Sequence, residues 1–129
     1  MSERISIIVT SGSREKLQMA AMVASVGAVS GAAVTVFLSM NALAFFRKGA
    51  ADPAPSEGEF GKLLEAKKAP DFKMLFEQAV ELGDASIRPC SMAVDVSGLK
   101  QADLESWVGE PLGLTKFLDD ARDGQIYTF

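Results

Sequence analysis

The sequence predicts an α/β protein: a single three-layer domain with a mostly parallel sheet of about five strands and helices on both faces. Strand-like runs alternate with helical stretches along the chain, which is the order that builds parallel sheets. The runs 5–10 (ISIIVT) and 33–38 (AVTVFL) are almost entirely apolar, as in strands buried on both faces. A length of 129 residues is that of one domain. We therefore expect residues 1–129 to form one domain with these two runs at the centre of its sheet.

The first third of the chain has the pattern of a strand–helix–strand unit. After the run 5–10, the side chain of Ser13 can cap a helix over 14–29 (REKLQMAAMVASVGAV), which is rich in alanine and methionine. Gly31 marks the end of that helix, and the strand 33–38 follows. Such a crossover makes the two strands parallel.

The middle of the chain is expected to hold a long loop between helices. A short helix is predicted over 39–46. The stretch 48–61 (KGAADPAPSEGEFG) contains prolines, glycines and small residues, so we expect a mobile loop near the cleft at the strand ends, and whether it acts as a lid stays open. Residues 60–66 add a turn or two of helix. The stretch 71–82 is the clearest amphipathic helix, and Gly83 is expected to end it.

The last third alternates short elements. We expect a strand at 85–88, helices at 92–96, 101–108 and 112–121, and a terminal strand at 125–129. The residues Pro89, Cys90 and Ser91 form the junction after the strand 85–88. The complete order favours a small, flavodoxin-like layered domain.

Composition excludes several classes of function. The chain has no histidine and one cysteine, which excludes Ser-His-Asp and Cys-His catalysis, a disulfide within the chain and a histidine- or cysteine-rich metal site. We expect no cofactor and no metal. The net charge of −4 and scattered basic residues argue against nucleic-acid binding. A lone free thiol is typical of a reducing compartment, so we expect a cytoplasmic protein.

An uncharged stretch runs from Leu17 to Phe46. Its length would suffice for a membrane span, but its polar residues and its break at Ser30 and Gly31 favour a buried helix followed by a buried strand. The same stretch offers more apolar surface than a chain of this size buries alone, so we expect a homo-oligomer.

Three loops fall at the carboxyl ends of predicted strands, where ligands bind in parallel sheets. Cys90 lies in one of them, between a strand and a helix, where the partial positive charge of a helix N-terminus favours a thiolate. Arg88 and Ser91 flank it. The turn Ser11, Gly12 and Ser13 could hold an anion with its amides, and Asn41 lies in the remaining loop. The competing interpretations are a buried structural cysteine and a plain turn with a helix cap.

Four segments together resemble the DsrE/DsrF/DsrH-like family, particularly its peroxiredoxin-like DsrE-type group. They are the strand and serine-rich turn 5–13, the helix and strand 19–38, NALAFFRKG at 41–49 and IRPCSMAVDV at 87–96. The resemblance implies a compact parallel α/β fold and, as in several members, a persulfide held on Cys90 and exchanged with donor and acceptor proteins. The chain departs from the family in the Arg88-Pro89 pair before the cysteine, and it has no resolving cysteine for peroxidase chemistry.

Two functions follow as hypotheses. The first is a sulfur carrier or sulfurtransferase that relays sulfane sulfur through Cys90 without a cofactor; whether such a relay is enzymatic stays open. The alternative is a non-enzymatic, oligomeric binding or regulatory module with a small-anion cleft at the strand ends. A third possibility is a membrane-associated accessory protein that uses residues 19–38.

Overall fold

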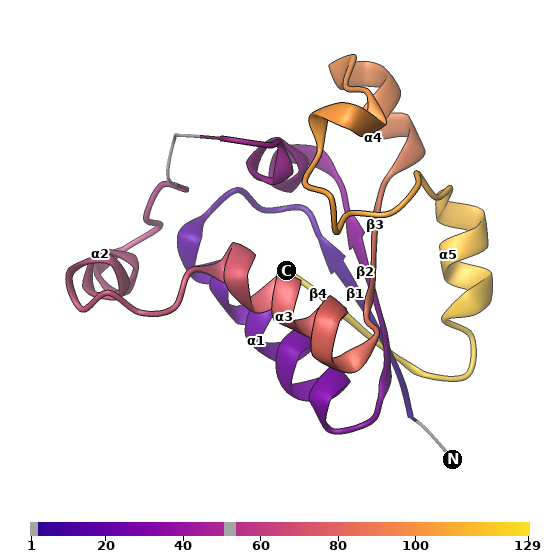
Figure 1. Cartoon of the computed structure of the whole chain (residues 1–129), viewed down its shortest axis with the longest axis horizontal. Helices are drawn as coiled ribbons and strands as arrows, with labels where there is room; N and C mark the ends of the chain where they lie inside the picture. Colours follow the sequence, from indigo (N-terminus) through magenta and orange to yellow (C-terminus); the bar gives the residue numbers. More distant parts are fainter. Residues whose placement is uncertain (1–2, 51–53) are drawn as a thin grey trace.

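The computed structural model describes residues 3–50 and 54–129 and contains one parallel four-stranded sheet (Figure 1). The strands are β1 (Arg4–Val9), β2 (Ala33–Leu38), β3 (Ser86–Pro89) and β4 (Gln125–Thr128), in the order β3-β2-β1-β4. The helices are α1 (Arg14–Val29), α2 (Glu59–Ala66), α3 (Phe72–Gly83), α4 (Ser91–Ser97) and α5 (Leu114–Asp120), with 3-10 turns η1 (Met40–Phe46) and η2 (Gln101–Asp103). The α/β class is confirmed, and β1 and β2 are the central strands as predicted.

Alternation along the strands separates two faces of the sheet. A Cβ on Gly27 of α1 would meet the side chains of Ile5 and Val34, so these residues face α1. Phe37 is three positions after Val34 on β2, so its side chain points to the opposite face of the sheet. There it packs on Phe117 of α5, with ring centroids 4.8 Å apart. Helices α1 and α3 therefore cover one face and α5 the other (Figure 1), which confirms the predicted layers.

Helices α1 and α3 approach each other very closely at Gly83. A Cβ at this position would lie 2.5 Å from the Cβ of Ala28 and 2.6 Å from its carbonyl carbon. The left-handed residue that ends α3 is the next one, Asp84, with φ 56°. Gly83 is therefore required for helix packing, whereas the sequence had indicated a role in ending the helix.

The sheet has four strands in the described part of the chain, and the expectation of about five is wrong by one. The position beside β3 is filled by residues 109–112, which pair with it irregularly: Gly109 donates to Ile87 (2.7 Å) and Leu112 to Pro89 (2.9 Å). Pro111 lies between these donors and has no N–H of its own, which prevents a regular ladder.

The predicted helices are mostly present, with one clear exception. The stretch 101–108 forms only the three-residue turn η2, and its last part is held by side-chain bonds from Gln101 to the carbonyls of Val108 and Gly109, both 3.0 Å. The segment after β2 is a 3-10 rather than an α-helix. In the aromatic core, Phe46 of η1 makes edge contacts with Phe72, Phe76 and Trp107, which bind η1, α3 and the 104–108 segment together.

The predicted loop 48–61 is shorter than expected, because α2 begins at Glu59. Its residues 51–53 lie outside the described part, so the predicted mobility and lid role stay predictions. Residues after them are fastened to the start of α1. Glu15 accepts hydrogen bonds from the amides of Glu57 (2.8 Å) and Gly58 (2.7 Å), and Arg14 donates to the carbonyl of Pro55 (2.9 Å). Among the described residues, no helix is long and apolar enough to span a membrane.

Candidate functional site

Cys90 lies at the carboxyl edge of the sheet, immediately after β3 and immediately before α4. Its backbone is fixed on several sides. The amide donates to the carbonyl of Leu38 at the end of β2 (2.7 Å), the carbonyl accepts from Val94 in α4 (3.0 Å), and a parallel bridge joins Cys90 to Leu112. The strand–cysteine–helix arrangement expected from the sequence is therefore what the backbone adopts.

The thiol of Cys90 is buried, with only 6% of the residue exposed. Cys90 is the N-cap residue of α4, yet its side chain accepts no hydrogen bond from the first turn. The first N–H groups of a helix lack partners within it, and here the first of them, the Ser91 amide, donates to the carbonyl of Leu112 rather than to the sulfur. The site thus has a fixed backbone and a sulfur that solvent barely reaches.

The residues beside Cys90 have defined partners of their own. The Nε of Arg88 donates to the carbonyl of Glu110 (2.5 Å), and its side chain lies over Gly109. The amide of Ser91 donates to the carbonyl of Leu112 (3.0 Å). Both residues thus fasten the 109–112 segment to the cysteine junction, which gives them a positioning role irrespective of any chemistry.

The turn Ser11, Gly12 and Ser13 is occupied by internal hydrogen bonds. Ser13 caps α1 by accepting from the amide of Lys16 (3.4 Å), and the Oγ of Ser11 accepts from the amide of Ser13 (3.0 Å). The amide of Ser11 donates to the carbonyl of Phe129 (3.3 Å). These bonds are those of a plain turn with a helix cap. The turn lies between β1 and β4, at the switch point of the sheet where ligands usually bind, and its own groups and Phe129 use the polar atoms there.

The predicted site residues form two groups along one sheet edge. A Cβ at Gly12 would lie 3.4 Å from the Cβ of Asn41 and 2.9 Å from the ring of Phe45, so the serine turn and η1 are in contact. Cys90, Arg88 and Ser91 lie beyond β2. Because two strand spacings separate the ends of β1 and β3, the groups are about 10 Å apart.

Two further residues at this edge, Ser39 and Met40, come from the same predicted strand-end loop as Asn41, although only Asn41 was singled out as a site residue. Ser39 is buried (4% exposed) and follows Leu38, the register partner of Pro89, so it is opposite Cys90. Met40 has φ 51° although it is not glycine, and it is 57% exposed. Neither a left-handed methionine nor a buried serine has a signal in a single sequence. Among the described residues, no cluster of three or more His, Cys, Asp or Glu side chains could hold a metal ion.

The fold and site define a parallel α/β protein with a single thiol at the carboxyl edge of its sheet. The sequence model of the DsrE/DsrF/DrsH-like family matches residues 56–129, more than half of the chain, and the protein belongs to this family. The matched region includes Cys90, Arg88 and Ser91, but it excludes the serine turn and Asn41. No curated protein matches the sequence.

Two solved structures share the fold over the whole chain. The YchN protein of E. coli is 16% identical, with a TM-score of 0.66 and 100% of each chain covered. The protein MTH1491 of Methanobacterium thermoautotrophicum, described as of unknown function, is 10% identical, with a TM-score of 0.64, 99% of this chain covered and 100% of the other. At these identities the likeness establishes the fold alone. Family membership makes the chain a protein of the sulfur-relay type, a class that acts with partner proteins in sulfur transfer.

Proposed function

We propose that the protein is a sulfur carrier that holds sulfane sulfur as a persulfide on Cys90 and passes it between protein thiols. The observation that carries the proposal is the place of this thiol. It is the only cysteine of the chain, it lies within the family-matched segment, and it is held at the junction of β3 and α4 by backbone bonds to β2 and α4.

The transfer step needs neither a cofactor nor a histidine. The Cys90 thiolate attacks the outer sulfur of a donor persulfide, a new S–S bond forms on Cys90, and the S–S bond of the donor breaks. The donor leaves as a thiolate, and the electron pair of the broken bond goes with it. The reverse exchange delivers the sulfur to an acceptor thiolate. Such a carrier requires a reducing compartment, and we infer that it works in the cytoplasm.

The burial of Cys90 sets a condition on this chemistry. A donor sulfur must approach the thiolate in line with the bond that breaks, and a residue only 6% exposed offers little room. We infer that exchange requires rotation of the Cys90 side chain or a small displacement of the 109–112 segment. Such gating would protect a bound persulfide from water and stray thiols between transfers.

The test is the mass of the intact protein after incubation with polysulfide. The wild type should gain about one sulfur atom (~32 Da) that reductant removes, since thiolate attack on sulfane sulfur leaves a persulfide. The Cys90→Ala variant should gain nothing, and Ser91→Ala, which keeps the thiol, should behave as the wild type. Alanine is preferred to serine because serine would place a hydroxyl in a buried position. Absence of a reducible adduct on the wild type would make Cys90 a structural residue.

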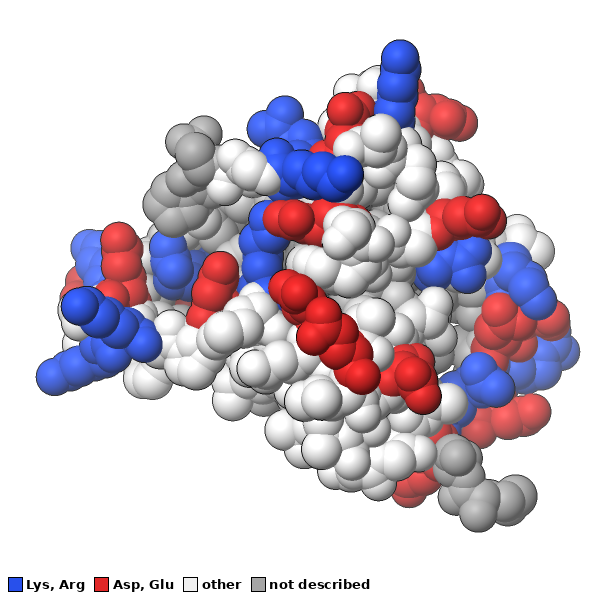
Figure 2. Space-filling view, viewed as in Figure 1, with Lys and Arg blue, Asp and Glu red and all other residues white. Residues whose placement is uncertain are grey.

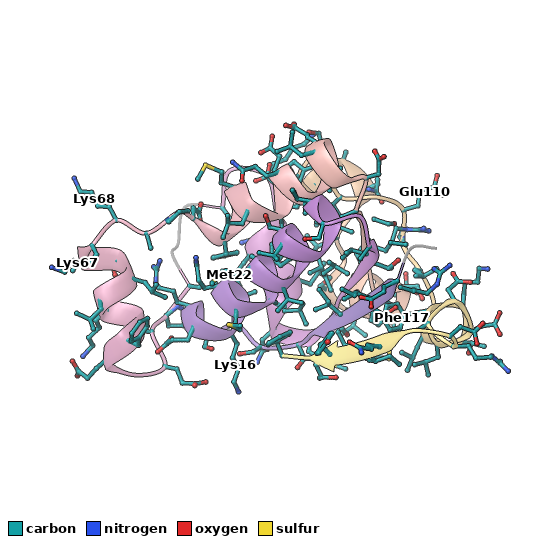
Figure 3. All side chains as sticks on the ribbon, turned by 90° about the horizontal axis from the view of Figure 1, so that it is seen from below. Lys16, Met22, Lys67, Lys68, Glu110 and Phe117 are labelled. Carbon is teal, nitrogen blue, oxygen red and sulfur yellow. The ribbon has the colours of Figure 1, made fainter. Side chains whose placement is uncertain are left out.

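We also propose that the carrier is a homo-oligomer. Helix α1 has an exposed apolar stripe at helical spacing, formed by Met19 (48% exposed), Met22 (45%), Val26 (66%) and Val29 (60%). Helix α1 lies between α3 and β4 (Figure 3). All four residues of β4 are exposed, including Ile126 and Tyr127. A second copy would cover this stripe and the open edge of β4.

Light scattering on the wild type and on Val26→Glu tests the assembly. The wild type should have the mass of a closed oligomer at micromolar concentration, and the glutamate should shift it toward the monomer because a charge cannot be buried unpaired in an apolar interface. A glutamate at Met92, an exposed methionine on α4, is the matched control. A monomeric wild type would disprove the proposal.

A further inference from the structure

A groove runs between η1 and the α4–η2 segment. It consists of two adjoining hollows that share Arg47 and Leu99: an inner one of about 300 Å³ and an outer one of about 520 Å³. The inner hollow is lined by Met40, Leu43, Ala44, Arg47, Ala93, Ser97 and Leu99. The outer hollow is lined by Arg47, Lys48, Gly49, Ala50, Leu99, Ala102 and Asp103. The size of each is within the range of small-molecule sites.

The inner end of the groove is close to Cys90. Ala93 and Ser97 come three and seven residues after Cys90, and this spacing places all three on one side of α4. Ala93 is one helical turn from the cysteine, a rise of about 4.5 Å. Met40 comes two residues after Leu38, whose carbonyl accepts the Cys90 amide. The inner hollow therefore begins about one helical turn from Cys90, which itself lines neither hollow.

The two ends of the groove differ in chemistry. The inner hollow is lined mainly by apolar side chains, and the outer hollow adds Lys48 to the shared Arg47. Two cations and one carboxylate line the outer hollow, Arg47, Lys48 and Asp103, and the nearby Lys73 is paired with Glu105. Figure 2 shows blue Lys and Arg side chains in the upper part of the view, with red Asp and Glu side chains among them. A local excess of positive charge in a chain of net charge −4 favours an anionic ligand.

The walls of the groove are joined by direct bonds. Lys48 donates its amide to the carbonyl of Asp103 (2.8 Å), and Glu105 donates to the carbonyl of Phe46 (2.9 Å). Lys73 pairs with Glu105 at 2.5 Å and also donates to the carbonyl of Arg47 (3.4 Å). One oxygen of Asp103 is engaged by the amide of Lys100 (2.8 Å). A groove whose sides are already connected needs little ordering to bind a ligand.

Met40 forms the lip of the inner hollow in an unusual backbone conformation. Its φ of 51° is the left-handed region, which costs a residue other than glycine about 1 kcal/mol or more. A large apolar side chain held there, 57% exposed, gains little for the core. Lys68 and Asp84 have the same left-handed conformation, so what sets Met40 apart is its exposed apolar side chain: an apolar lip beside a narrow hollow suits a sulfur-bearing aliphatic group.

We propose that the η1–α4 groove binds a small organic anion that carries a thiol or persulfide, with its carboxylate at Arg47 and Lys48 and its sulfur beside Met40. Only the placement of the ligand's sulfur rests on the proposed function of Cys90. Binding of the ligand's carboxylate needs no chemistry at Cys90. A small ligand is favoured over a protein segment, since the hollows have small-molecule dimensions.

The test uses S-methylglutathione, a tripeptide with two carboxylates and a blocked sulfur, so that binding is separated from sulfur transfer. Titration followed by amide chemical shifts should show saturable binding, with the largest changes at Ala93, Leu99 and Lys48. Arg47→Gln and Lys48→Gln should each weaken binding about tenfold, the usual order for losing a charge-assisted hydrogen bond. Lys62→Gln removes an equal charge from the distant α2 and should leave binding unchanged.

Separate outcomes distinguish the two proposals. Cys90→Ala should bind the probe as the wild type does, whatever the result of the polysulfide experiment. Absence of saturable binding would overturn the groove proposal, as would equal binding by the Arg47→Gln/Lys48→Gln variant. Binding of an acidic peptide in preference to the tripeptide would also overturn it in favour of a protein partner. Uptake of polysulfide sulfur by Cys90 is independent of each of these results.

Discussion

Replacing Gly83 by alanine should destabilise the protein, although alanine is the better helix former. The added Cβ would lie 2.5, 2.6 and 2.7 Å from the Cβ, carbonyl carbon and carbonyl oxygen of Ala28, whereas ordinary contact begins at 3.4 Å. The helices would have to separate by about 0.9 Å along the shortest of these contacts. Overpacking of this kind costs about 1–3 kcal/mol. The gain in helix propensity is at most about 1 kcal/mol, so even with the full gain the net loss should reach about 2 kcal/mol.

The neighbouring residue offers a matched control of opposite sign. Asp84 has φ 56°, so Asp84→Gly relieves left-handed strain and should stabilise the protein by about 0.5 kcal/mol. Urea denaturation of both variants measures the two effects as shifts of the midpoint at constant slope. Adding Ala28→Gly to Gly83→Ala should give little rescue, because the contacts with the Ala28 carbonyl group remain. A higher midpoint for Gly83→Ala would refute the close approach of α1 and α3.

Three further substitutions test other parts of the structure. The amides of Glu57 and Gly58 hold the pKa of Glu15 below its ordinary value, so the loop is fastened at neutral pH and released as the pH falls through the lowered pKa. Glu15→Gln should speed amide exchange at Glu57 and Gly58 at neutral pH and remove the loss of protection, relative to the intrinsic exchange rate, that the wild type shows as the pH falls; unchanged exchange would contradict this role. Phe117→Ala should lower the free energy of unfolding by about 3–5 kcal/mol in urea denaturation, because the buried ring that packs against Phe37 is lost. A decrease below about 1 kcal/mol would mean that other contacts hold α5. Gly124→Ala should release β4 from β1, since its Cβ would overlap the Arg4 carbonyl; retained amide protection in β4 would count against the pairing.

The central sheet was predictable because its signals are local. The runs before Gly12 and after Gly31 are continuous and apolar, and the positions of β1, α1 and β2 agree with the prediction to within a residue at each end. Likewise the cysteine junction follows from its place between the predicted short strand 85–88 and a helical stretch. Short-range patterns of this kind depend on the chain alone.

The predictions from the sequence failed where contacts between distant parts of the chain determine the local structure. The stretch 101–108 has helical composition, but side-chain bonds from Gln101 and the packing of Trp107 against Phe46 hold it as a turn and an extended segment. The serine turn had the composition of an anion cradle, yet its Ser11 amide is used by Phe129, which is 118 positions away in the sequence. No local pattern reports such a partner.

The sequence by itself determined the α/β class, the parallel central strands, the exclusion of histidine-dependent chemistry and the choice of Cys90, because these depend on residue types and short periodicities. Only the tertiary structure decided how exposed Cys90 is, which of the serine amides are free, and why Gly83 has no side chain. It also formed the groove beside the cysteine, whose walls come from residues 40–50 and 93–103. These properties depend on which distant segments pack together, and a contact between distant segments has no signature in either segment alone.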